Sequence, residues 1–201
     1  MSRRLVLASG NPGKLREFAA LLGPGWELVP QDRLGVAPVD ETGTTFRENA
    51  LLKARHAALA TGLPALADDS GLEVDALGGA PGVYSARYAG PGASDAANNA
   101  RLLAALADVP GPARTARYRC VLVLVAGPDD PAPLVAEGTW EGRIGFGPRG
   151  TGGFGYDPLF IDAASGLTGA ELEPAAKNAR SHRGQALGAL RRLLAAGSGG
   201  A

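Results

Sequence analysis

Residues 5–22 read LVLASGNPGKLREFAALL and contain, in this order, an apolar run, a turn of small residues and a helical pattern. The apolar run at 5–8 predicts a short buried strand, and residues 12–22 predict a helix that begins at Pro12. Proline suits the first helical position because its missing N–H would have no partner there. A strand that passes directly into a helix across residues 9–11 predicts an α/β layered fold.

Strand and helix patterns continue along the rest of the chain. Thr45 to Glu48 form a capping box, which predicts a helix start. Further strands are predicted at 26–29, 63–67, 118–125 and 134–144, and further helices at 46–61, at 94–106 and from Ser181 onward. We expect a single domain over residues 1–196, because no linker separates independent parts, and a disordered tail over residues 197–201.

Composition excludes several classes of protein. The 201 residues carry 20 basic and 20 acidic side chains, so the net charge of zero gives no field for capture by nucleic acid or an acidic membrane. The single cysteine, Cys120, excludes an intrachain disulfide and fits a reducing compartment. No stretch approaches the roughly 20 apolar residues of a membrane span. We therefore expect a cytoplasmic protein with a small-molecule partner, no nucleic acid and no membrane.

The chain uses lysine very sparingly. Its 20 basic residues are 17 Arg and only 3 Lys, which are Lys14, Lys53 and Lys177. If codon bias alone explained this count, the three lysines would lie at positions without a particular function. Each one nevertheless lies in a segment that contains other reactive or hydrogen-bonding groups, and lysine differs from arginine in geometry and hydration.

The turn at residues 9–14, SGNPGK, has features of an anion-binding loop. A Walker A motif needs four residues between its first glycine and Gly-Lys, and here only Asn11 and Pro12 intervene, so a P-loop NTPase is disfavoured. Backbone N–H groups would still lie at the positive end of the helix dipole. Asn11 and Lys14 would add a side-chain donor and a charge. The alternative interpretation is a tight turn with a solvated lysine.

Asp68 and Asp69 follow the strand predicted at 63–67. Adjacent carboxylates repel each other unless a divalent cation or a proton offsets their charge, and Mg²⁺ prefers such hard oxygen ligands. The alternative is an Asp-rich turn in which Ser70 and Gly71 supply the turn chemistry.

Two segments near the C-terminus could contact an aromatic ligand. Residues 150–158 place Phe154 and Tyr156 on a glycine-rich backbone, and an aromatic face is a stacking platform for a nucleobase. Residues 177–183 gather hydrogen-bond donors at a helix start, where cations oppose the helix dipole. The alternatives are a loop whose rings pack on the core and a solvated basic run.

Five motifs in this order resemble the inosine triphosphatase family of noncanonical purine nucleoside triphosphate pyrophosphatases. They are SGNPGK at 9–14, TTFRENALLKA at 44–54, ADDSGLEVDALGGAPGVYSARYAG at 67–90, FGYDP at 154–158 and KNARSHRGQAL at 177–187. The resemblance implies an elongated α/β fold with a mixed central sheet flanked by helices, and two lobes with a cleft between them. It also implies a homodimer and Mg²⁺-dependent hydrolysis of ITP, dITP or XTP to the monophosphate and pyrophosphate.

The resemblance further implies roles for individual residues. Catalytic roles fall to Asp69, Asp68 and Lys53, and Mg²⁺ ligation falls to Glu41 and Asp69. Substrate binding falls to Ser9, Gly10, Asn11, Pro12, Gly13, Lys14, Ser70, Phe154, Gly155, Tyr156, Asp157, Lys177, His182 and Arg183. Whether Asp68 or Asp69 is the general base stays open. Arg180 departs from the family, which often has an apolar residue at this position.

Base selectivity follows from hydrogen bonding. Hypoxanthine and xanthine present a 6-keto acceptor where adenine has a 6-amino donor, so a buried donor from Lys177, His182 or Arg183 would be left unpaired against adenine. Two alternatives are a Maf-like pyrophosphatase acting on dTTP or UTP, and a non-catalytic nucleotide-binding module. The Maf-like group typically has Ser-Pro-Arg-Arg where this chain has residues 11–14. The acidic residues argue against a pure anion binder.

Overall fold

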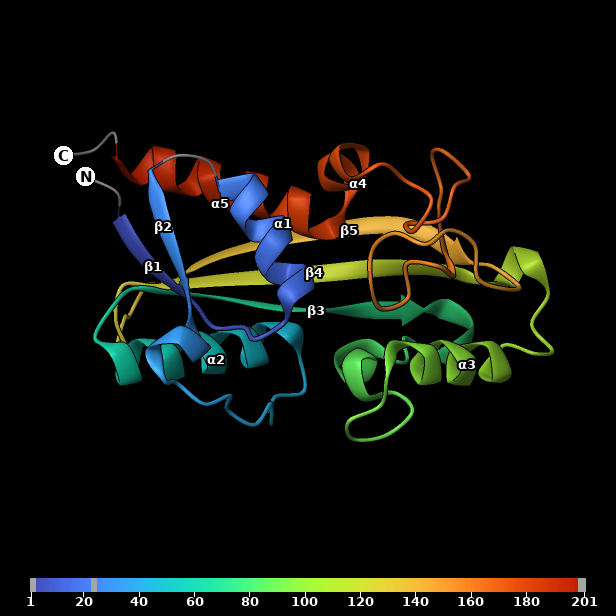
Figure 1. The fold of residues 1–201 in the computed structure, drawn as a ribbon, viewed down its shortest axis with the longest axis horizontal. Coiled ribbons are helices and arrows are strands. Elements are labelled where there is room, and N and C mark those ends of the chain that lie inside the picture. Colours follow the sequence, from blue (N-terminus) through green and yellow to red (C-terminus); the bar gives the residue numbers. More distant parts are fainter. Residues whose placement is uncertain (1–2, 23–24, 199–201) are drawn as a thin grey trace. The chain divides into compact units, whose positions relative to one another are not determined.

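The computed structural model describes residues 3–22 and 25–198, which form a mixed α/β fold (Figure 1). Its strands are β1 (Arg3–Leu7), β2 (Trp26–Pro30), β3 (Ala65–Val74), β4 (Thr115–Val125), β5 (Leu134–Ile144) and β6 (Phe160–Asp162). Its α-helices are α1 (Pro12–Leu22), α2 (Phe46–Thr61), α3 (Asp95–Ala105), α4 (Pro174–Arg180) and α5 (His182–Ser198). Short 3₁₀ helices lie at Gln31–Leu34, Asp75–Leu77, Gly82–Arg87 and Gly111–Ala113.

The six strands form one sheet in the order β2-β1-β3-β4-β5-β6. Strand β1 pairs in parallel with β2 and β3, whereas β6 pairs antiparallel with β5. The predicted α/β fold with a mixed sheet and flanking helices is therefore confirmed.

The chain divides into two compact units. Unit 1 comprises Met1–Asp69, Cys120–Gly138 and Arg183–Ala201, and unit 2 comprises Ser70–Arg119 and Thr139–His182. Strands β3, β4 and β5 each contribute residues to both units.

Helices cover both faces of the strands of unit 1 (Figure 1). On one face, Phe18 of α1 and Leu187 and Leu190 of α5 join a core cluster with strand residues such as Leu66 and Leu122. On the other face lies α2, whose buried side chains are largely alanines: Ala50, Ala54, Ala57 and Ala58. Small alanine side chains allow the helix to approach the sheet closely, which brings the polar residues of α2 near β3.

Unit 2 has an aromatic core. Tyr118, Trp140 and Phe160 pack together with ring centroids 4.7 to 6.0 Å apart, and Leu102 of α3 joins the same cluster. Strands β5 and β6 approach closely at Gly142, where an added Cβ would lie 2.3 Å from the carbonyl oxygen of Ile161. Glycine at this position therefore permits the pairing of the two strands.

The structure corrects several sequence expectations. Strand β3 was expected to end before Asp68 but continues to Val74, and neither β6 nor α4 was predicted. The final helix includes Gly197 and Ser198, the first two residues of the predicted tail, and residues 199–201 lie outside the described part of the chain. Among the described residues, no helix is long and apolar enough to cross a membrane.

Candidate active site

Asp68 and Asp69 lie inside strand β3 and not in a loop after it. Successive side chains of a strand point to opposite faces of the sheet. Asp68 accordingly contacts Lys14 of α1, whereas Asp69 contacts Lys53 of α2. Each carboxylate therefore has a lysine partner of its own, and the two side chains do not lie side by side.

Asp68 is the centre of a buried ion cluster in unit 1. Its side chain is fully buried and accepts hydrogen bonds from the Lys14 ammonium, from Arg183 Nε at 3.0 Å and from the Cys120 thiol at 3.3 Å. Burial alone would raise the pKa of Asp68, but the charges of Lys14 and Arg183 hold that pKa well below its usual range. Arg183 Nη1 also donates to Glu17 on α1 at 2.6 Å. Asp68 therefore stays ionised and holds the side chains of Lys14 and Arg183 in place.

Asp69 lies in a different environment. Its Oδ1 accepts from Lys53 Nζ at 2.7 Å, and the same ammonium donates to Glu41 Oε1 at 2.7 Å. Burial raises the pKa of Asp69 to about 6; the charge of Lys53 opposes this shift and that of Glu41 adds to it. For Lys53, burial lowers the pKa, but Asp69 and Glu41 together raise it above its usual value. Asp69 can therefore exchange a proton near neutral pH.

The residues around Asp69 fit a magnesium ion. The second carboxylate oxygen of Asp69, Oδ2, is buried and has no hydrogen-bond partner in the described part of the chain, although a buried carboxylate oxygen normally has one. Within residues 3–22 and 25–198, no group of three or more His, Cys, Asp or Glu side chains could enclose a metal ion. Mg²⁺ commonly uses only one or two carboxylates plus water and substrate phosphates, so Asp69 and Glu41 are a sufficient pair.

Asn49 fixes the loop that carries Glu41. The Asn49 side chain is completely buried on α2, and its Oδ1 accepts from the backbone N–H of Gly43 at 2.7 Å. An added Cβ on Gly43 would lie 2.6 Å from that same oxygen, so only glycine fits. The predicted capping box is confirmed, since Thr45 and Glu48 bond each other's backbone N–H groups. The loop before α2 is therefore anchored to the helix start.

The loop between β1 and α1 differs from the expectation in one respect. Asn11 was expected to donate from its side chain, but its Oδ1 instead accepts from the backbone N–H of Gly13 at 2.8 Å and of Lys14 at 3.2 Å. Asn11 thus caps α1 and occupies two of the N–H groups predicted for anion binding. Ser9 Oγ in turn accepts from the Asn11 N–H, and Gly10 is exposed. Pro12 is the first residue of α1, as predicted.

In unit 2, Asp157 organises the segment predicted to hold a base. Its Oδ2 accepts from the backbone N–H of Phe154 at 2.8 Å and from Lys177 Nζ at 2.8 Å. The same ammonium lies 5.1 Å from the centroid of the Phe154 ring. An added Cβ on Gly153 would lie 2.1 Å from Asp157 Oδ2, which explains the glycine there. Asp157 therefore positions Phe154 and Lys177 relative to each other.

The other predicted substrate-binding residues near the base segment, together with Ser70, divide between the two units. Tyr156 is buried and donates to the Ser85 carbonyl at 2.7 Å, and Gly155 is held by Asp95 of α3, whose Oδ2 accepts its N–H at 2.7 Å. His182 stacks on Tyr118 in unit 2, with ring centroids 4.6 Å apart. Ser70 is half-buried in β3 and begins unit 2, whereas Arg183 belongs to the Asp68 cluster of unit 1.

Some residues of this site were not predicted from the sequence. Glu17 lies one turn after Lys14 on α1, so helical spacing could have identified it. Cys120 was not predicted to take part either; it is buried, and its thiol donates a hydrogen bond to Asp68. Arg180, the departure from the family pattern, pairs with the buried carboxylate of Asp162 at 3.1 Å, which explains how a charged residue is accommodated there.

Comparisons with known proteins found similar sequences and similar solved structures. A model of the Ham1 family matches residues 5–193. The dITP/XTP pyrophosphatase of Methylococcus capsulatus is 59% identical over 201 residues, which is 100% of both chains. The solved structure of a HAM1 protein from Coxiella burnetii matches with a TM-score of 0.88 and 49% identity, covering 96% of this chain and 99% of that one. The Staphylococcus aureus Ham1 structure matches with a TM-score of 0.85 and 41% identity, covering 97% and 100%.

The two carboxylates should respond differently to neutralisation. Asp68→Asn leaves Lys14 and Arg183 without their buried counter-charge, so we expect the free energy of unfolding at pH 7 to fall by about 3–5 kcal/mol. Asp69→Asn removes a carboxylate whose charged form burial already disfavours, so we expect little loss. Urea unfolding of the metal-free protein measures the free energy of unfolding of both variants. Equal losses in the two variants would contradict the assignment of Asp68 as the carboxylate held in ion pairs and Asp69 as the one with the raised pKa.

The same experiment has a defined pH dependence. Because the pKa of Asp69 rises from 3.8 to about 6 on folding, the native state binds this proton more tightly than the unfolded chain. The resulting stabilisation is complete below the unfolded pKa of 3.8 and is lost as the pH rises through the folded pKa of about 6. Between these two pH values, wild type should therefore lose stability relative to Asp69→Asn. For Asp68 the sign is opposite, since its lowered pKa stabilises the fold above pH 3.8.

Proposed function

Because the chain belongs to the Ham1 family, we propose that it is a dITP/XTP pyrophosphatase. It hydrolyses noncanonical purine nucleoside triphosphates, namely ITP, dITP and XTP, to the monophosphate and pyrophosphate, and so cleanses the nucleotide pool of the cytoplasm. The observation that carries this proposal is the contrast between two adjacent carboxylates: Asp68 is locked in ion pairs, whereas Asp69 has a raised pKa and an unpartnered oxygen.

Asp69 is the general base in this proposal. A base works best when its pKa lies near the working pH, and the pKa of Asp69 is about 6. The buried Asp68 is held ionised by Lys14 and Arg183 and has no tendency to accept a proton. Asp69 therefore orients and deprotonates the water that attacks the α-phosphorus, while Asp68 keeps the surrounding cations in place.

Lys14 and Lys53 neutralise the triphosphate. In the free protein both ammonium groups are paired with Asp68, Asp69 and Glu41, so their positions are fixed before substrate arrives. Fixed cations aimed at developing charge stabilise a transition state without having to reorganise. The departing pyrophosphate gains negative charge, and these lysines offset it.

Mg²⁺ is the cofactor of the proposed reaction. Glu41 and Asp69 would hold it, and when bound it would supply positive charge that neutralises phosphate oxygens. Lys53 contributes because its ammonium lies 2.7 Å from an oxygen of each carboxylate, which holds the two side chains near each other. Asn49 contributes through Gly43, because it fixes the backbone of the loop that carries Glu41.

Residues of unit 2 recognise the base. Phe154 offers a ring for stacking, and Lys177 beside it offers a donor to a 6-keto oxygen. An adenine 6-amino group would leave that buried donor unpaired, which disfavours ATP. Guanine shares the 6-keto group, so its rejection depends on the 2-position of the purine.

The family resemblance also supports a homodimer. Sedimentation equilibrium at micromolar concentration should give twice the mass of one chain. A mass of one chain at all concentrations would contradict this part of the proposal.

A substrate panel tests the function directly. With Mg²⁺ present, we expect kcat/KM for ITP, dITP and XTP to exceed that for ATP by more than about hundredfold, because a site built to pair with the 6-keto oxygen rejects a base that leaves its donor unpaired. GTP keeps the 6-keto oxygen, so we expect its turnover to be low only through rejection at the 2-position of the purine. The nucleoside monophosphate and pyrophosphate should be the only direct products. Equal turnover of ATP and ITP, or direct release of orthophosphate, would contradict the proposal, as would tight ITP binding without turnover, which is the behaviour of a non-catalytic module.

Two variants complete this test. Asp69→Asn should lower turnover by at least about a hundredfold, which is the smaller rate loss typical of removing a general base. The variant should remain folded. Asp75→Asn is the matched control, since Asp75 is exposed and pairs with Arg117 in unit 2. Near-normal turnover of Asp69→Asn would refute the role of Asp69, and chelation of Mg²⁺ should abolish activity in wild type.

A further inference from the structure

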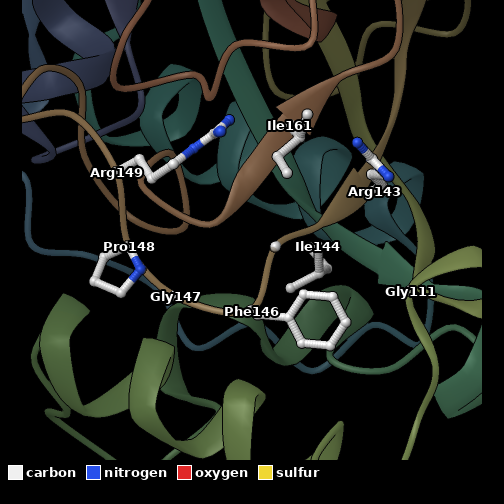
Figure 2. Close-up of a pocket in the computed structure, with 9 residues that line it drawn as sticks. Gly111, Arg143, Ile144, Phe146, Gly147, Pro148, Arg149 and Ile161 are labelled. Carbon is white, nitrogen blue, oxygen red and sulfur yellow. The ribbon is translucent and has the colours of Figure 1, made fainter.

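A pocket in unit 2 lies among residues to which the proposed reaction gives no role. It has a volume of about 420 Å³ and is lined by residues from the end of β5, the segment that follows it and β6. Figure 2 shows Arg143 and Arg149 on either side of Ile161, with Ile144 and Phe146 across from them. The size lies within the range of small-molecule sites, about 300–1,000 Å³.

The lining of the pocket is basic, since it includes Arg143 and Arg149. None of its lining residues is acidic. Within the described residues, the Arg143 side chain takes part in no hydrogen bond or ion pair. Arg149 donates to the Gly166 carbonyl at 3.0 Å and lies 3.2 Å from the partly exposed Glu171, so its guanidinium keeps further donors. Two guanidinium groups on one wall favour an anion such as a phosphate or carboxylate.

The opposite side of the pocket presents an aromatic ring. Phe146 is 72% exposed, although large apolar side chains are usually buried. Its ring is held on the guanidinium of Arg114, which lies 4.0 Å from the ring centroid. Arg114 is itself only 3% exposed and donates to the carbonyls of Leu106, Val109 and Gly145. Phe146 is therefore held in place while most of its surface remains open to solvent.

Arg114 places a buried positive charge beneath the Phe146 ring. No carboxylate of the described chain forms an ion pair with it, so carbonyl dipoles are its only hydrogen-bonding compensation. A positive charge beneath an aromatic ring withdraws electron density, which suits stacking against an electron-rich planar ring.

From these observations we propose that the pocket formed by Arg143, Ile144, Phe146, Arg149 and Ile161 binds a planar aromatic anion the size of a purine nucleoside monophosphate. The base stacks on Phe146, and the phosphate is bound by Arg143 and Arg149. None of the residues that line this pocket is among those assigned to hydrolysis, and binding at it does not require the proposed reaction.

The chain offers an unusually selective probe of this pocket. Ile144 and Ile161 are the two isoleucines in the 201 residues, and both line it. A ¹³C spectrum of isoleucine δ1 methyl groups therefore contains two resonances, each of which reports on the pocket. Titration of the full chain with inosine 5′-monophosphate should shift both resonances in a saturable way, with half-saturation below about 1 mM, the weak end of specific binding.

Ligand fragments and variants identify the chemistry. Inosine, which lacks the phosphate, and ribose 5-phosphate, which lacks the base, should each bind at least about tenfold more weakly, since each loses one of the two contacts. Phe146→Ala and Arg143→Gln should weaken the nucleotide to a similar extent. Arg143→Gln breaks no internal contact and so keeps the test valid if Phe146→Ala perturbs the fold. Leu59→Ala is the matched control, because Leu59 is also 72% exposed but lies on α2 in unit 1.

Several outcomes would overturn the proposal. Absence of a shift at 10 mM nucleotide would do so, as would equal binding of ribose 5-phosphate, which would indicate a general phosphate patch. Shifts that follow protein concentration without ligand would assign the pocket to a second copy of the chain. Loss of the shift in Lys53→Met together with its retention in Phe146→Ala would assign the effect to the hydrolytic site. Failure of the substrate panel, in contrast, would leave this binding test intact.

Discussion

The buried carboxylate of Asp68 is the interaction on which the candidate site depends. It joins three elements of unit 1, because Lys14 comes from α1, Arg183 from α5 and Cys120 from β4. A carboxylate removed from water is costly unless charged partners and hydrogen bonds compensate it, and removal of any one partner leaves the others uncompensated. The cluster therefore fixes the start of α1, and with it the loop assigned to the triphosphate.

Alternation along one strand separates the structural carboxylate from the reactive one. Because β3 runs through both residues, Asp68 faces α1 and α5, and Asp69 faces α2. The first carboxylate meets two cations and keeps its charge, whereas the second shares Lys53 with Glu41 and has a raised pKa. Unit 2 also contains a lysine paired with a buried aspartate, since Lys177 is paired with Asp157. All three lysines of the chain are thus held by buried aspartates.

Local sequence signals predicted the elements that local interactions determine. The strand, turn and helix of residues 5–22 and the capping box at Thr45 depend on neighbours in the chain, and the structure has both. The extension of β3 through Asp68 could not be predicted locally, since polar residues and a glycine favour a turn unless neighbouring strands pair with them. The partners of Arg183 are distant in sequence, so its ion pair with Asp68 could not be predicted from the local donor cluster at residues 177–183.

The central claim is that Asp68 stays ionised while its neighbour Asp69 exchanges a proton near neutral pH. A ¹³C NMR titration of the aspartate carboxyl carbons in the metal-free protein tests this most directly, with Asp69→Asn identifying the resonance of Asp69. We predict a midpoint near pH 6 for Asp69 and no protonation of Asp68 while the protein remains folded. A midpoint for Asp69 at or below the usual 3.8, or a midpoint for Asp68 above that of Asp69, would contradict the account.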